Sequence, residues 1–290
     1  MTRRCTQRQM LLRPEPMVEQ IYLYCIAEAV QRFEMSLHGC GAMSNHQHSE
    51  VTDNLGNFPE YLAHFHKMMS KAMNVLRGRR ENFWATEQPN AVYLVEAEDR
   101  FAKLIYLLAN PVADHLVDRV TDWPGASSYG LHMAGRTITV KRPKCFFADD
   151  GDMPEEVTLR IVRPPGFEDL SEAEWRAKIA DAVRVEEERA RETRRRLGWR
   201  VLGRKGVLRA SPTDVPSKPE ALGGIRPNIA CRRRERRDFE LAALLDFRIR
   251  RTDALRRLRG GERDVIFPFG TYRIWGVFKT APGPAAPLAS

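Results

Sequence analysis

The chain has 290 residues, of which 43% are hydrophobic and 29% charged, and its formal net charge is +9. This composition is ordinary for a globular protein and allows one large domain, or a domain of typical size with an appendage. The five cysteines include no C-x-x-C pair, which argues against a disulfide framework or a zinc ribbon and favours reduced thiols in the cytosol. The longest apolar run, residues 21–30, is too short to cross a membrane, and we expect no signal peptide.

In the N-terminal half, strand and helix patterns alternate. Apolar residues recur at helical spacing in the second and fourth segments, and Pro111 is expected to end the last helix at Asn110. The predicted order is strand 4–12, helix 18–36, strand 43–52, helix 59–76 and helix 97–108.

The C-terminal half begins with a short strand pattern at residues 137–140. Ser171 and Glu174 form a capping box for a long charged helix that ends near Gly198. Pro, Gly and Ser are frequent in residues 203–231, which predicts a linker. A further helix is expected at 235–258, and the last ten residues are expected to be disordered. The predicted parts are a domain at 1–150, a charged helical extension at 151–200, a linker at 201–231 and a basic helical region at 232–280.

Positive charge is concentrated in the C-terminal third. Residues 191–260 hold 21 Lys and Arg against 8 Asp and Glu, a net charge of +13, whereas the rest of the chain has a net charge of −4. A region of this kind is typical of a polyanion-binding surface, and the five arginines within residues 232–237 favour nucleic acid. The alternative is a solvated helix surface.

Two histidines lie two residues apart in the third predicted element. In a strand, the side chains of His46 and His48 point to the same face about 7 Å apart, where two imidazoles can hold one divalent ion. Glu50 shares this face, either as a further ligand or as a solvated acid. His64 and His66 have the same spacing in a helical pattern. There they diverge by about 200° and cannot share a metal, so we interpret them as surface or packing residues.

Tyr106 and Asn110 are one helical turn apart on one face of the predicted third helix. A tyrosine hydroxyl has a pKa near 10 and is a poor nucleophile unless a cation polarises the phosphate that it attacks. An amide oxygen one turn away is a plausible further ligand for that cation. The alternative is a buried tyrosine with a satisfied hydroxyl, followed by an Asn-Pro helix stop.

Four motifs in order resemble one known family, the IS200-like transposases of the single-tyrosine HUH type, and the REP-associated branch matches best. The similarity covers about residues 1–130, a little under half of the chain. The motifs are Met43-Ser44-Asn45-His46-Gln47-His48, Phe83-Trp84, Tyr106 to Val112, and Asp122 to Tyr129. The chain differs from the family pattern at Ser44, at Gln47 and at Ser49-Glu50; a core-facing Gln47 requires hydrogen-bond partners.

The resemblance implies an α+β fold, a ferredoxin-like α/β sandwich with a central antiparallel sheet, to which the mainly helical basic C-terminal region is added. It implies that His46, His48 and Asn110 bind Mg²⁺ or Mn²⁺. Tyr106 would attack a DNA phosphate, forming a 5′-phosphotyrosine link and freeing a 3′-hydroxyl. It also implies single-stranded or hairpin DNA as the substrate, a homodimer, and a nucleoid-associated location in the cytoplasm.

Basic residues outside the site are candidates for contacts with DNA phosphates. Trp84 could stack on an unpaired base but is more typical of a half-buried core residue, and Trp123 is interpreted as packing. The phosphate candidates are Arg3, Arg4, Arg8, Lys67, Lys71, Arg79, Arg80, Arg232, Arg233 and Arg234.

Three hypotheses follow. The first is a transposase that cleaves and rejoins single-stranded DNA. The second is a catalytically silent nucleic-acid-binding protein on the same fold. The third is a metallonuclease that uses water as its nucleophile, forms no covalent adduct and does not need Tyr106.

Overall fold

The computed structural model describes residues 1–135, 137–217 and 228–271, and within them the chain is α+β with a small antiparallel sheet. None of the described helices is both long and apolar enough to cross a membrane. In chain order the elements are β1 (Thr2–Arg4), the 3-10 turn η1 (Thr6–Arg8), α1 (Pro16–Arg32), β2 (Met35–Ala42), β3 (His46–Asp53), α2 (Phe58–Leu76), β4 (Tyr93–Leu94), α3 (Ala97–Ala113), η2 (Val120–Asp122), α4 (Tyr129–Ala134), β5 (Ile138–Lys141), β6 (Glu156–Leu159), α5 (Glu172–Leu197), α6 (Gly203–Arg209), β7 (Ile229–Ala230) and α7 (Arg234–Arg259).

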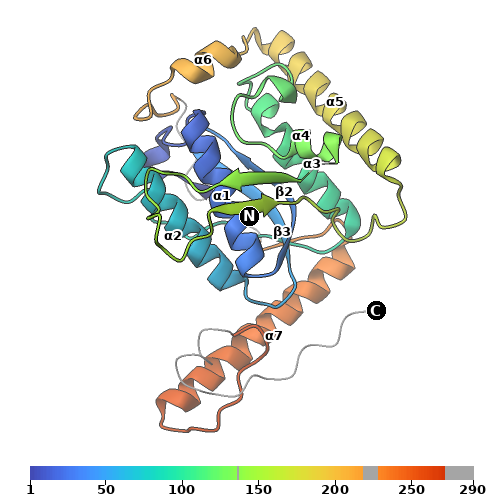
Figure 1. The fold of residues 1–290 in the computed structure, drawn as a ribbon. Coiled ribbons are helices and arrows are strands. Elements are labelled where there is room, and N and C mark those ends of the chain that lie inside the picture. Colours follow the sequence, from blue (N-terminus) through green and yellow to red (C-terminus); the bar gives the residue numbers. More distant parts are fainter. Residues whose placement is uncertain (136, 218–227, 272–290) are drawn as a thin grey trace.

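The central sheet has the strand order β1-β3-β2, and both pairings are antiparallel (Figure 1). The register places Thr2 opposite His48. On the far side of β1, isolated bridges join Thr2 to Asn90 and Cys5 to Trp84, so the segment 84–90 continues the sheet beyond its edge strand. Four segments therefore lie side by side in the order 84–90, β1, β3 and β2.

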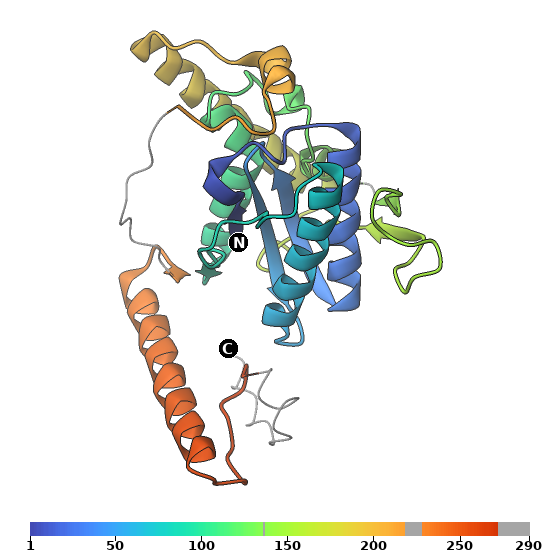
Figure 2. The ribbon, with the colours of Figure 1, turned by 90° about the vertical axis from the view of Figure 1, so that its left-hand side faces the viewer.

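The two faces of the sheet have different covers (Figure 2). On one face, α1 and α2 enclose the larger core, with Tyr22, Tyr61 and Phe65 fully buried. On the other face α3 crosses β2 and β3. It approaches β2 closely because Gly39 lacks a side chain: a Cβ there would lie 2.5 Å from Leu104 Cδ1. This close approach brings α3 over the histidine strand.

A second core joins α3 to α5, with Leu104, Leu108 and Val112 packed in the same cluster as Trp175 and Ile179. The β5–β6 hairpin packs on the larger core through Val140, Val157 and Leu159. The predicted domain boundary at residue 150 falls in the loop of this hairpin. Both strands of the hairpin, before and after the boundary, therefore pack with the N-terminal half.

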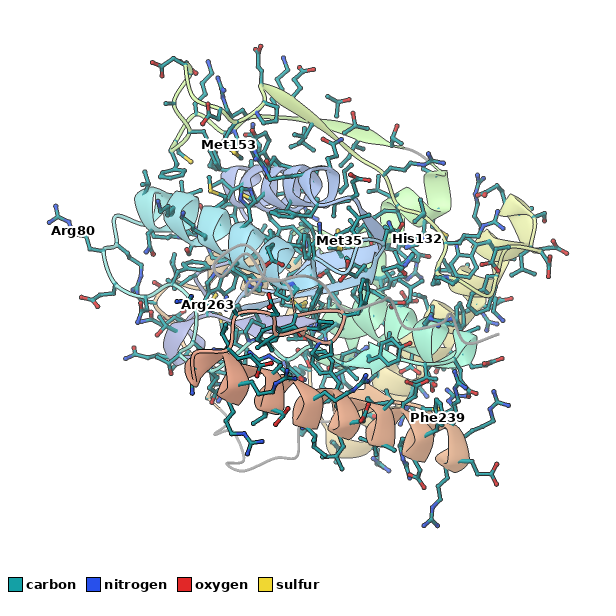
Figure 3. All side chains as sticks on the ribbon, turned by 90° about the horizontal axis from the view of Figure 1, so that it is seen from below. Met35, Arg80, His132, Met153, Phe239 and Arg263 are labelled. Carbon is teal, nitrogen blue, oxygen red and sulfur yellow. The ribbon has the colours of Figure 1, made fainter. Side chains whose placement is uncertain are left out.

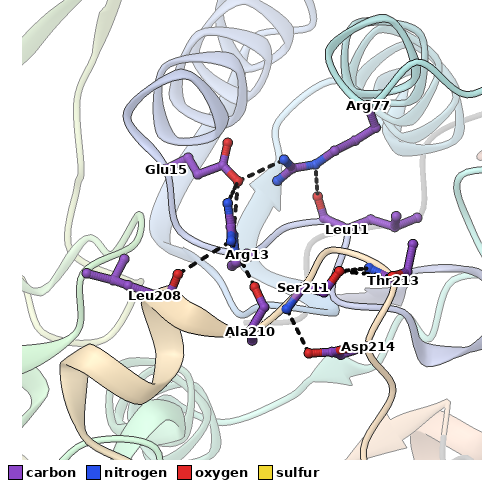
Figure 4. A network of polar contacts seen from close by, with 9 residues as sticks. All are labelled: Leu11, Arg13, Glu15, Arg77, Leu208, Ala210, Ser211, Thr213 and Asp214. Carbon is purple, nitrogen blue, oxygen red and sulfur yellow. Dashed lines mark hydrogen bonds and ion pairs between the residues drawn. The ribbon is translucent and has the colours of Figure 1, made fainter.

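Part of the predicted linker is a docked segment. Leu202 and Gly203 donate backbone hydrogen bonds to the carbonyls of His115 and Leu116, and α6 follows directly, which corrects the prediction of a linker over 203–209. Figure 4 shows how the segment after α6 is held: Arg13 donates to the carbonyls of Leu208 and Ala210 while it pairs with Glu15. Arg77 at the end of α2 pairs with the same Glu15, at 2.8 Å.

The last described helix, α7, extends away from the sheet as an arm (Figures 1 and 2). Its first residues follow β7, which pairs in parallel with β4 next to the start of α3. Many of its side chains are open to solvent, including Phe239, labelled in Figure 3 and 61% exposed. The predicted disorder of the last ten residues lies outside the described residues.

Several predicted elements are confirmed, among them β3, α2, β5, α7 and α5 with its Ser171–Glu174 capping box. Besides the linker over 203–209, three predictions are wrong. The first strand spans Thr2–Arg4 instead of 4–12, because a 3-10 turn with Gln7 at φ 50° follows it. The helix predicted to residue 36 ends at Arg32, and β2 follows. Finally, α3 continues through Pro111, since a proline in the last turn removes only one backbone hydrogen bond.

Candidate active site

The structure brings the four residues of the predicted site together between β3 and α3. His46 and His48 have ring centroids 4.6 Å apart and ring planes at 89°. From α3, the Tyr106 ring meets His48 edge-on with centroids 5.9 Å apart. Asn110, one turn further, is close enough to act on the pKa values of His46, His48 and Tyr106. The strand alternation and the i, i+4 spacing therefore converge on one point.

The outer nitrogen of each imidazole is held by a polar neighbour. His46 Nδ1 lies 2.7 Å from Asn45 Oδ1, and Asn45 turns its amide nitrogen to the Arg8 carbonyl, at 3.3 Å. Because an amide oxygen only accepts, Nδ1 of His46 carries the proton and its Nε2 keeps a lone pair. His48 Nδ1 lies 2.7 Å from Thr2 Oγ1. Partners of this kind orient metal-ligating histidines.

Both imidazoles are neutral at physiological pH. Burial lowers the pKa of His46 to about 4. Burial also holds the pKa of His48 well below its usual value, and the nearby His46 adds to this effect. A neutral imidazole is the form that binds a metal ion, so no proton has to leave before an ion binds.

The unsatisfied polar atoms fit a bound cation. His48 Nε2 and Asn110 Oδ1 are buried and have no hydrogen-bond partner, although buried polar atoms normally have one. Two imidazole nitrogens and an amide oxygen form a donor set that suits Mn²⁺ better than Mg²⁺, which prefers oxygen ligands. His46, His48 and Asn110 would hold such an ion.

Glu50 is not a solvated acid. Its side chain is buried, neither carboxylate oxygen has a hydrogen-bond partner, and burial raises its pKa to about 8. Its carboxylate does not form a cluster with the two histidines, since the described residues meet a 4.8 Å ligand spacing only at Glu96, Asp99 and Cys231. Glu50 therefore lies on the histidine face without joining the cluster.

Tyr106 is 51% exposed, which contradicts the alternative of a buried structural tyrosine. Burial of its remaining surface raises the pKa of its hydroxyl, Asp114 raises it further, and the Asn110 amide lowers it. The Lys103 ammonium lies 5.3 Å from the centre of the Tyr106 ring. Tyr106 is thus accessible to a substrate and lies next to the Lys103 ammonium. Lys103 was not among the site residues predicted from the sequence.

Seven of the ten basic residues predicted to contact DNA fall into three groups. Arg3 stacks on Trp84 at 5.4 Å, and Arg4 pairs with Glu87 at 2.8 Å while its charge lowers the pKa of His46. Arg8 lies beside the site, where its carbonyl binds Asn45. The third group belongs to α2 and the loop after it, which cover the opposite face of the sheet; Figure 3 shows Arg80 projecting outward there. This group comprises Lys67, Lys71, Arg79 and Arg80.

The arginines at and just before the start of α7 lie close to acidic side chains of the same chain. Arg232 lies 3.9 Å from Asp99, Arg233 pairs with Glu96, and Arg234 lies 3.6 Å from Asp238. Their side chains nevertheless remain at least two-thirds exposed.

Residues predicted to be structural are confirmed as such. His64 Nε2 lies 2.6 Å from Glu28, whereas His66 is buried against Trp84 and Gln47. The Trp84 indole donates to the His66 carbonyl at 2.9 Å, and Trp123 donates to the Ala42 carbonyl. Each of these contacts serves packing.

Comparison of the chain with protein-family models, with curated proteins and with solved structures found no match.

Proposed function

We propose that the protein is a metal-dependent tyrosine transposase that cleaves and rejoins single-stranded or hairpin DNA. The observation that carries the proposal is the convergence of unsatisfied His48 Nε2 and Asn110 Oδ1 beside a half-exposed Tyr106. Two buried polar atoms without partners are costly unless something binds them. A nucleophile placed next to such a pair is typical of an active site.

The order of the sheet supports a ferredoxin-like sandwich as the fold that carries this site. The chain runs β1–α1–β2–β3–α2 and then through 84–90, and these segments lie in the order 84–90, β1, β3, β2. Helices α1 and α2 share one face, which leaves the other face for α3 and Tyr106. We also propose that the protein acts as a homodimer and that the basic helix α7 helps to bind the DNA.

In the proposed reaction, the Tyr106 oxygen attacks a phosphorus atom of the DNA backbone. A bond forms between this oxygen and the phosphorus, the bond from phosphorus to the 3′-oxygen breaks, and the tyrosine proton is transferred to that leaving oxygen. The product is a 5′-phosphotyrosine and a free 3′-hydroxyl. A bound divalent ion supplies charge withdrawal from the phosphate oxygens. Lys103 and Arg4 provide positive charge near the same phosphate.

Rejoining is the reverse of this step. A 3′-hydroxyl attacks the phosphotyrosine, the phosphodiester forms again, and the tyrosine recovers its proton. Because the covalent link conserves the energy of the broken bond, no ATP is required.

The test uses a randomised single-stranded DNA pool with hairpins, labelled at the 3′ end, because the 3′ fragment stays on the enzyme. With Mn²⁺ we expect a protein–DNA adduct on a denaturing gel. Tyr106→Phe should reduce it by at least about 10³-fold, as expected for loss of a nucleophile. Tyr93→Phe, at a tyrosine 58% exposed on β4, is the matched control and should leave it unchanged.

Two outcomes contradict the proposal. Cleavage without an adduct, unaffected by Tyr106→Phe, would establish water as the nucleophile. Tight binding with neither cleavage nor adduct would support a silent nucleic-acid-binding protein.

A further inference from the structure

A cluster of three ligand-type side chains lies at the start of α3, away from the histidine site. Glu96 is the N-cap residue of α3, Asp99 lies in its first turn, and Cys231 directly follows β7. One ligand atom from each lies within 4.8 Å of the others. The cluster therefore combines two carboxylates with a thiol from a segment more than a hundred residues away.

Backbone pairing fixes the two segments against each other. β4 and β7 run parallel, with Tyr93 opposite Ile229 and Leu94 opposite Ala230. Val95 donates a further hydrogen bond to the Ala230 carbonyl at 3.2 Å. Glu96, two residues past β4, and Cys231, directly after β7, are thus held close together by the main chain.

Asp99 carries an unsatisfied charge that the fold does not explain. Its side chain is only 6% exposed, and its Oδ2 atom is buried without a hydrogen-bond partner. Its ion pair with Arg232 is long, at 3.9 Å, and the arginine side chain is 69% exposed. A buried carboxylate with so weak a partner is destabilising unless a cation lies against it.

We propose that Cys231, Asp99 and Glu96 form a second metal site that binds a zinc-class ion. Thiolate and carboxylate are both zinc ligands, and the thiolate selects against Mg²⁺ and Ca²⁺. Around one zinc, ligand atoms lie about 3.3–3.8 Å apart, which small side-chain rotations reach from the present spacing. Water takes the fourth position, and the Cys231 proton is released to solvent when the sulfur–metal bond forms.

The charges around the cluster are compatible with this ion. Three anionic ligands and one dication leave a single negative charge, and Arg232 and Arg233 lie at the rim to balance it. Such an ion would fasten the root of α7 to the first turn of α3, the helix that also carries Tyr106. The inference does not depend on the proposed transposase activity.

Cobalt(II) provides the test, because a thiolate bound to cobalt gives an intense near-ultraviolet charge-transfer band. The full chain with His46→Ala and His48→Ala is titrated with Co²⁺, so that the histidine site does not contribute. We expect one equivalent of Co²⁺ to saturate the band, and Zn²⁺ to displace it. Cys231→Ser should abolish the band, and Cys145→Ser, at the partly exposed thiol, should leave it unchanged.

Asp99→Asn keeps the size of the side chain and guards against a result due to misfolding. It should weaken Co²⁺ binding by about 10- to 100-fold or more, since even indirect partners of a metal have effects of that size. Absence of the band from the parent protein would show that the arginine pairs alone satisfy the cluster. Persistence of the band in Cys231→Ser would also overturn the proposal.

Discussion

The chain contains the pattern histidine–x–histidine twice, once in β3 and once in α2, and the two copies differ in what they can do. In β3 the rings of His46 and His48 lie 4.6 Å apart on one face. In α2, His64 pairs with Glu28 while His66 points into the core against Trp84. The same spacing therefore places two imidazoles side by side in a strand, where we propose that they bind a metal, and gives two unrelated packing contacts in a helix. The secondary structure that carries the pattern thus decides whether its two rings can face one ion.

Substitutions in the two histidine pairs should differ most strongly in their effect on activity. His48→Ala removes a proposed metal ligand and should reduce formation of the DNA adduct by at least about 10²-fold, more than the loss of a residue that only orients a ligand. His66→Ala should leave the activity per folded molecule unchanged and cost about 1–3 kcal/mol of stability, because it opens space in the core. Adduct yield measures the activity, and urea unfolding measures the stability. Equal loss of activity in the two variants would contradict the distinction.

The next effect concerns Glu50, on the same face of β3 as the ligand pair. Its folded pKa of about 8 lies above its usual value of 4.5, so the folded state binds more protons and stability falls as pH rises from 4.5 to about 8. Glu50→Gln should remove this fall and stabilise the protein at pH 8 by about 4 kcal/mol at most. Urea unfolding with a chelator at pH 5 and pH 8 tests it. An unchanged pH dependence would contradict the burial of a protonated carboxyl.

His46 should have the opposite dependence. Its folded pKa of about 4 lies below its usual value of 6.5, so the unfolded state binds more protons and stability is lost as pH falls from 6.5 to about 4. The loss should be about 3 kcal/mol at most. Burial also lowers the pKa of His48, His66 and His132, so His46→Gln in the Glu50→Gln background should reduce this loss without abolishing it. An unchanged loss in this variant would contradict the burial of a neutral His46.

The smallest effect tests the other face of β3. Gln47 lies between the two histidines in the sequence, and its side chain points to the opposite face. It is fully buried, and its Oε1 atom has no hydrogen-bond partner. Gln47→Met removes that atom but also the Nε2 contact with His66, at 3.4 Å, so the two effects oppose each other and stability should change by less than about 1 kcal/mol. Thermal unfolding measures this change, and adduct formation should not change. A loss of activity would show that the core face of β3 also acts in the site.

Much of the site could be predicted because its spacing is local. Side-chain alternation in β3 placed His46 and His48 together, and the helical turn in α3 did the same for Tyr106 and Asn110. What remained hidden depends on tertiary contacts. Thr2 orients His48 only because β1 pairs with β3, and no pattern in residues 1–12 indicates that register. Lys103 is one of many lysines until α3 is placed.

Helices and strands could be predicted where the amphipathic pattern is regular. The prediction failed where the pattern is irregular. The long α5 helix was predicted from its capping box and from its end near Gly198, and both features were confirmed. By contrast β2 contains Gly39 and Gly41 and is buried over most of its length, so it shows no alternation of polar and apolar residues. The docking of α6 depends on the Arg13–Glu15–Arg77 network, in which the partners come from distant parts of the chain.

The most direct measurement is Mn²⁺ binding followed by electron paramagnetic resonance. The unmodified protein is compared with a β3 variant, His46→Ala/His48→Ala, and an α2 variant, His64→Ala/His66→Ala. We predict that the unmodified protein and the α2 variant each bind one Mn²⁺ that the β3 variant does not bind. Equal binding by all three proteins would show that the β3 histidines are not ligands and would contradict the proposed site.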